Sequence, residues 1–141
     1  MTAPGDPPMT APGFPVSWAL LRVVPHPHTG EGVPVGVVLQ SRPAEFIGLR
    51  AITDPGHLRA LAPDADIELL ARYLRACIAI AEGAGDGGDI ALLSAPERFH
   101  WLTAPRSDVL QPGPVHHERA DDPAALLDHL FRTLVDAPDG R

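Results

Sequence analysis

Apolar positions near the start of the chain cluster in three runs without a helical period, which is the pattern of β-strands buried on one or both faces. The runs cover residues 16–24, 33–40 and 45–52 and are rich in valine, leucine and isoleucine. Short links join the runs, and this favours an antiparallel meander. Arg22, Gln40 and Arg50 come from three different runs, so they are candidates for one polar face of the sheet.

Two later segments carry apolar side chains at the three-to-four-residue spacing of an amphipathic helix. The first begins after a cap at Asp64 or Asp66 and continues to about Glu82. The second follows the Asp-Pro pair at 122–123. Another Asp-Pro pair, at 54–55, predicts a short helical turn. In both pairs the aspartate can accept hydrogen bonds from the first turn, and proline fits the first helical position.

The segment around residue 100 has two interpretations, a helical turn over 97–102 or a strand over 99–103. Before it, the glycine-rich residues 83–88 predict a flexible link, and residues 90–93 are a candidate fourth strand. After it, residues 109–111 predict a short edge strand, because the prolines that follow cannot donate to a ladder.

Together these elements predict an α+β fold, an antiparallel β-meander covered on one face by two main helices. A chain of 141 residues is long enough for one core, so we expect a single domain over residues 16–136. Residues 1–15 are proline-rich and predict a disordered lead. Residues 137–141 predict a frayed tail.

The charged residues exclude several classes of function. All eleven basic residues are arginine, and without lysine the chain can build neither a Schiff base nor a lysine-dependent phosphate loop. The net charge of -7 argues against a nucleic-acid partner, since such binding depends on neutralising phosphates. A single cysteine, Cys77, excludes a disulfide framework. No apolar stretch reaches membrane length and no secretion signal is evident, so we expect a cytoplasmic protein.

Two runs carry a resemblance to a known family. They are residues 21–25 with 30–39, and residues 97–106 with the Gln-Pro that follows at 111–112. They resemble the bacterial family named domain of unknown function 3037, over about residues 17–135. The resemblance supplies no activity, but members are often encoded beside a HipA-like kinase-fold protein, which implies a protein partner. The family pattern has asparagine where this chain has Pro34, so no role for an amide side chain at that position is carried over.

The chemistry-bearing side chains concentrate between residues 97 and 117. A histidine near a carboxylate can serve in acid-base chemistry, and an arginine can clamp an anion bidentately. The same side chains also suit a salt-bridged turn around buried aromatic rings, and this structural interpretation is favoured. The candidate binding or contact residues are Arg98, His100, Trp101, Arg106, Gln111 and His116.

Two pairs of histidines are the only metal-like features, His26 with His28 and His116 with His117. Neither pair has a diagnostic ligand spacing, and adjacent histidines on a strand would point to opposite faces. We therefore expect exposed loop histidines, with no metal site and no cofactor.

Two functions are consistent with these features. The first is a small cytoplasmic binding or accessory module that acts through a protein partner, with the HipA-like kinase-fold protein as the candidate. Tryptophan and arginine dominate interface energetics, so the region around Trp101 is a candidate contact surface. The alternative is an enzyme or ligand-binding domain for a small anion, which would use the Arg and His residues of the 97–117 region: Arg98, His100, Arg106 and His116. The sequence does not decide whether the chain is an enzyme.

Overall fold

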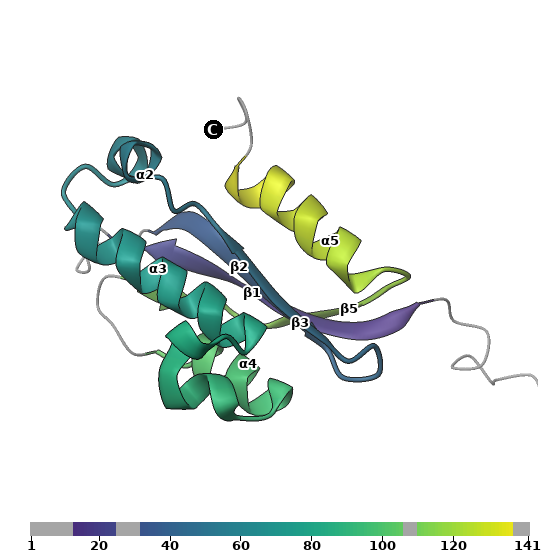
Figure 1. Cartoon of the computed structure of the whole chain (residues 1–141). Helices are drawn as coiled ribbons and strands as arrows, with labels where there is room; N and C mark the ends of the chain where they lie inside the picture. Colours follow the sequence, from purple (N-terminus) through teal and green to yellow (C-terminus); the bar gives the residue numbers. More distant parts are fainter. Residues whose placement is uncertain (1–12, 25–31, 106–109, 137–141) are drawn as a thin grey trace, which may run out of the picture.

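A computed structural model describes residues 13–24, 32–105 and 110–136. Its centre is an antiparallel sheet in the order β3-β2-β1-β4, with β5 also paired to β1 (Figure 1). The first three strands form the expected meander. The strands are β1 (Phe14–Val23), β2 (Val33–Ser41), β3 (Phe46–Ala51), β4 (Leu110–Pro112) and β5 (His116–Ala120).

Strand β1 pairs with two strands along the same edge. β4 lies beside its end and β5 beside its start. Between them the ladder is interrupted at Gly113, whose N–H still donates to the Leu20 carbonyl at 2.7 Å. The short edge strand expected near residue 110 is confirmed, although Val109 lies outside the described residues. β1 starts earlier than expected, because Phe14 and Pro15 pair with the end of β5, so the proposed lead cannot extend to residue 15.

Local capping determines where the helices begin. The Asp54 carboxylate accepts from the His57 N–H at 2.9 Å, and the Asp66 carboxylate accepts from the Leu69 N–H at 3.2 Å. Gly83 ends the longest helix with a φ of 71°, a left-handed conformation that glycine adopts without steric penalty. The α-helices in the described part of the chain are α2 (Pro55–Leu61), α3 (Ile67–Glu82), α4 (Ala95–Thr103) and α5 (Pro123–Leu130).

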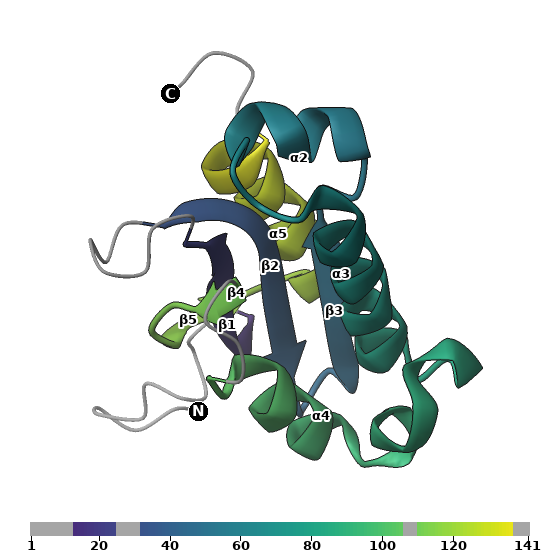
Figure 2. The same ribbon diagram turned by 90° about the vertical axis from the view of Figure 1, so that its left-hand side faces the viewer.

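The α+β class and the antiparallel sheet are confirmed, but the two main helices do not share a face of the sheet. α3 packs below β1 and β3, whereas α5 lies across the opposite face (Figures 1 and 2). A side chain added at Gly48 would strike Leu127 of α5, while the adjacent Leu49 lies on the α3 side. The central strand β2 is therefore buried on both faces, which is why its residues 35–39 are apolar or glycine.

Helix α5 continues into a π-helical turn, η3 (Phe131–Val135), and is tied to the sheet by charge. Arg50 of β3 donates to Asp128 and lies over the Phe131 ring, 4.6 Å from its centroid. Partial desolvation alone would raise the pKa of Asp128. The hydrogen bonds and charges of Arg132 and Arg50 outweigh it and hold this pKa below its usual range.

Two expectations of strand geometry are wrong. Residues 90–93 do not form a strand, because Gly85–Leu92 forms a 3₁₀ helix, η2, against the end of α3. Gly87 permits this contact, since a side chain there would lie 3.0 Å from the Ile80 nitrogen. Gln40 and Arg50 also do not share a face: Gln40 pairs with Ile47, three residues before Arg50, and side chains alternate along a strand.

Within the described residues, no helix is both long enough and apolar enough to cross a membrane.

Candidate functional site

The segment around residue 100 is helical, which decides between the two interpretations of the sequence. Ser94 and Glu97 form a reciprocal capping box at the start of α4. Glu97 Oε1 accepts from the Ser94 N–H at 3.2 Å and from its hydroxyl at 2.8 Å. The hydrogen bond from the Ser94 side chain, and then that from its backbone, hold the pKa of Glu97 below its usual range. The Ser-x-x-Glu spacing was the local signal for this helix.

Arg98 is bound to backbone carbonyls of its own chain. Its Nη1 donates to the carbonyls of Ile80 and Ala81 at 3.0 and 2.7 Å, and its Nε donates to that of Leu93 at 3.0 Å. The first two carbonyls belong to the last turn of α3, where a helix leaves carbonyls without intrahelical partners. Arg98 therefore joins the end of α3 to the start of α4.

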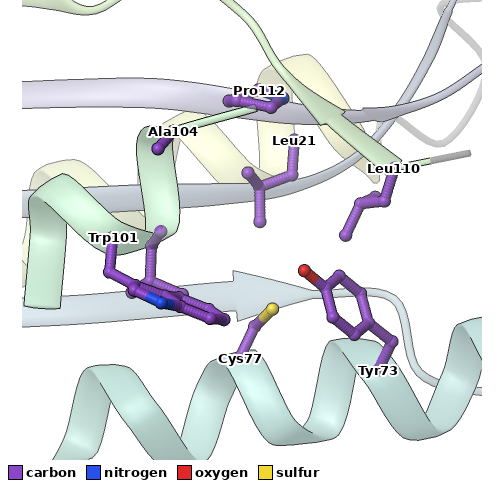
Figure 3. A pocket seen from close by; sticks show the side chains of 8 residues that line it. Leu21, Tyr73, Cys77, Trp101, Ala104, Leu110 and Pro112 are labelled. Atoms are coloured by element: carbon purple, nitrogen blue, oxygen red, sulfur yellow. The ribbon is translucent and has the colours of Figure 1, made fainter. Parts of the chain in front are cut away.

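The inner side of α4 is packed into the core. Phe99 and Leu102 are buried, and Trp101 lies beside Cys77 and Tyr73 of α3 (Figure 3). The cavity lined by these side chains measures about 10 Å³, which is room for about one water molecule. Burial raises the pKa of the Cys77 thiol to about 11, so this thiol is a core group rather than a reactive thiolate.

The outer side of the α4 corner is apolar and open. Leu92, the last residue of η2, is 82% exposed, and Leu93 beside it is also exposed. A shallow hollow of about 370 Å³ extends from Leu93 along the first turns of α4. We call this the η2–α4 surface; it consists of Leu92, Leu93, Pro96, Glu97, His100 and Trp101. His100 and Trp101 were expected in a contact surface, whereas sequence reasoning assigned Leu92 and Leu93 to a strand.

The remaining candidate residues do not join this surface. Arg106 lies outside the described residues. Gln111 is half-buried in β4 opposite Arg22. His116 lies in β5, which pairs with β1 along the same edge as β4. The structure thus places His100 and Trp101 together on the η2–α4 surface, next to Arg98 in α4, whereas Gln111 and His116 do not line this surface.

The histidines of β5 are exposed as expected, but they belong to a strand and not to a loop. As alternation requires, they point to opposite faces of the sheet. His116 stacks on Trp18 with ring centroids 4.3 Å apart, and Glu118 accepts from Trp18 Nε1 at 2.7 Å. On the other face, His117 Nδ1 lies 2.9 Å from the Ser17 hydroxyl oxygen.

Metal-ligating side chains do not gather in threes anywhere among the described residues. His26 and His28 lie outside those residues. At the α4 corner, polar side chains instead hold the backbone by hydrogen bonds, and the apolar side chains of Leu92 and Leu93 are exposed.

The comparisons with known proteins agree with the sequence resemblance. The family model described as protein of unknown function (DUF3037) matches residues 18–135. Neither a curated protein nor a solved structure gives a match. A family match over most of the chain shows its membership, and the chain therefore belongs to the DUF3037 family of proteins of unknown function.

Proposed function

We propose that this chain is a small binding module that acts through a protein partner, and that the η2–α4 surface is its docking site. The observation that carries the proposal is the 82% exposure of Leu92 at the edge of an apolar hollow. A single exposed leucine is ordinary. Exposed apolar side chains that gather beside a half-buried tryptophan are typical of an interaction site.

The hydrogen bonds that hold the backbone beneath this surface favour the binding of a partner. Arg98 and Glu97 fix the peptide unit between Leu93 and Ser94, because Arg98 donates to the Leu93 carbonyl and Glu97 accepts from the Ser94 N–H. A surface held in one conformation loses little conformational entropy when a partner docks. Rigid presentation of Leu92 and Leu93 thus supports a preformed interface.

The charges around the surface specify the chemistry of the partner. Glu82, Asp89 and Glu97 are exposed on the three elements that meet at this corner, and the Arg98 guanidinium is already engaged by carbonyls. A complementary partner would present an apolar centre with basic residues at its rim. The family resemblance makes the HipA-like kinase-fold protein the candidate for this partner.

The alternative function, an enzyme or ligand-binding domain for an anion around Arg98, gains no support from the geometry. A guanidinium that donates to three carbonyls has few donors left for an anion. The adjacent core cavity has room for only about one water molecule.

The experiment is a calorimetric titration of the purified chain with a purified HipA-like kinase-fold protein, the partner that the family resemblance implies. Leu92→Asp should weaken the complex at least tenfold, because it places a charge in the apolar centre of the interface. The matched control is Leu69→Asp, which makes the same change at an exposed leucine of α3 outside the η2–α4 surface. That variant should bind within about twofold of the wild type.

Selective loss with Leu92→Asp would support the proposal. Absence of a complex with the wild-type chain would refute the choice of partner. An equal loss with both variants would show that the η2–α4 surface is not the docking site.

A further inference from the structure

A second hollow, separate in its lining residues from the η2–α4 surface, is lined largely by polar side chains. It measures about 210 Å³ and is formed by the start of β1, the end of β2 and β5. Pro15 and Pro43 form apolar parts of its wall, and no helical residue lines it. The polar side chains on its sheet face are Ser17, Gln40, Arg42 and His117.

Three of these side chains form a row across three neighbouring strands. Ser17 of β1 is paired in register with Gln40 of β2 on one side and with His117 of β5 on the other. The Ser17 hydroxyl and His117 Nδ1 are 2.9 Å apart. This contact holds the imidazole over the sheet and leaves its Nε2 for a further partner. Glu118 also lines the hollow, but its carboxylate accepts from Trp18 Nε1 and alternation along β5 directs its side chain to the face opposite His117.

Gln40 is the unsatisfied member of the row. Its Oε1 is buried and has no hydrogen-bond partner, which is uncommon for a buried polar atom. The terminal torsion of a glutamine side chain has a broad, shallow energy profile. The amide can therefore turn toward the hollow when a group with a donor hydrogen enters it.

Arg42 supplies the charge at this site. It follows Gln40 by two residues, is exposed, and forms no ion pair within the described part of the chain. A single guanidinium matches a carboxylate in two parallel hydrogen bonds. Phosphate sites generally add a helix N-terminus or further cations, and the lining of this hollow includes neither.

We propose that this hollow is a binding site for a small carboxylate with an N–H or O–H donor close to the carboxylate group. Arg42 binds the carboxylate, and the amide of Gln40 accepts from the neighbouring donor. Ser17 and His117 provide the polar floor. The volume of about 210 Å³ lies below the roughly 300–1,000 Å³ of sites for drug-sized ligands, which limits the ligand to about one amino-acid unit. Both a peptide C-terminus and a free hydroxy acid have this chemistry.

The test is a titration of the full chain with small probes, in which NMR monitors the backbone amides and histidine rings. N-acetylglycine represents a peptide C-terminus and lactate a free hydroxy acid. Acetate lacks the neighbouring donor, N-methylacetamide lacks the charge, and inorganic phosphate is the competing anion. We expect N-acetylglycine or lactate, whichever source is correct, to shift His117 saturably and to bind at least fivefold more tightly than the three other probes.

Matched variants assign the residues. Arg42→Gln should weaken binding of the better probe at least fivefold, whereas Arg59→Gln, the same change at an exposed arginine of α2, should leave it unchanged. Gln40→Met should weaken binding without lowering the thermal midpoint, because methionine has a similar shape and removes an unpaired buried acceptor. A structural glutamine would lower the midpoint when replaced.

The site is refuted if neither carboxylate saturates, if phosphate binds more tightly than both, or if Arg59→Gln weakens binding as much as Arg42→Gln. None of the residues in this hollow belongs to the η2–α4 surface. Each proposal can therefore fail without the other.

Discussion

Two regions of the molecule arrange polar and apolar groups in opposite ways. At the α4 corner, the polar side chains of Ser94, Glu97 and Arg98 bind main-chain atoms, and the leucines beside them are exposed. At the β5 edge, Trp18 is buried beneath His116 and Glu118, and polar side chains line the hollow on the other face of the sheet.

This difference separates two kinds of recognition. Apolar side chains on a rigid support can bury area against another protein surface. Polar side chains around a small hollow can bind a small polar ligand, because each donor and acceptor finds a partner there. The same chain thus offers a surface suited to a protein partner and a hollow suited to a small carboxylate. Stability measurements can test the contacts that support each region from within.

The largest effect on stability is expected for Trp18, the buried ring at the β5 edge. Trp18→Ala should lower the free energy of unfolding by about 3–5 kcal/mol, because it removes a large buried ring. Trp18→Phe keeps most of the ring and loses the hydrogen bond to Glu118, so it should cost only about 1 kcal/mol. Urea unfolding followed by circular dichroism measures both. Equal costs would show that the hydrogen bond, rather than the ring, stabilises this edge.

Arg98→Ala should have the next largest effect on stability, because Arg98 joins the end of α3 to the start of α4. Removal of the guanidinium takes its hydrogen bonds from the carbonyls of Ile80 and Ala81, at a cost of about 1.5–3 kcal/mol, although the Ile80 carbonyl still accepts from the Gly83 N–H. Arg75→Ala is the control, since Arg75 is exposed on α3, and it should change stability by less than about 0.5 kcal/mol. The same urea titration applies. A loss below that of the control would mean that Arg98 does not join the two helices.

Ser94→Ala should have a smaller effect at the same corner. It removes the N-cap of α4, which costs about 1 kcal/mol. Ser94→Gly should recover most of this loss, because glycine is tolerated at an N-cap and leaves its N–H open to water. Thermal unfolding of the three proteins compares them. If Ser94→Gly were less stable than Ser94→Ala, backbone flexibility rather than capping would dominate.

The smallest effect is a dependence of stability on pH. The pKa of Glu97 is lowered from its usual 4.5, so the folded state favours the charged carboxylate. Its contribution to stability is therefore present above about pH 4.5 and is lost as the pH falls through the lower folded-state value. The pKa of Asp128 is also lowered, so Asp128 adds a pH dependence of the same sign. A comparison of the wild type with Glu97→Gln removes this contribution, because both proteins contain Asp128. The wild type should lose more stability than Glu97→Gln between about pH 5 and pH 3; parallel losses would contradict the capping-box contribution.

Elements specified by nearby residues were predicted well. Asp54, Asp66 and Asp122 cap the helices that they were expected to start, and each acts on an N–H only three residues away. The apolar stripe of α3 was recognised for the same reason, since residues three or four apart share one side of a helix. Leu69 does not belong to this stripe, because it lies on the outer side of α3 and is 54% exposed.

The candidate site was predicted only in part. Trp101 and His100 were named as candidate contact residues, and both line the hollow of the η2–α4 surface. The structural role favoured for Arg98 was an ion pair in a turn, whereas its guanidinium donates to backbone carbonyls. Its partner carbonyls at Ile80 and Ala81 are 18 and 17 residues away, which no local pattern indicates. Leu92 and Leu93 were misassigned for a related reason, because a short apolar run fits a strand or an exposed turn equally well.

By itself, the sequence determined the α+β class, the three-strand meander, the capped starts of the helices and the family to which the chain belongs. These features follow from interactions between residues a few positions apart and from motifs that are visible in the sequence itself. The tertiary structure alone decided that α3 and α5 cover opposite faces and that β5 returns to pair with β1, where Trp18 meets a glutamate 100 residues away. Such pairings depend on how the whole chain closes around its core, so local spacing carries no signal for them.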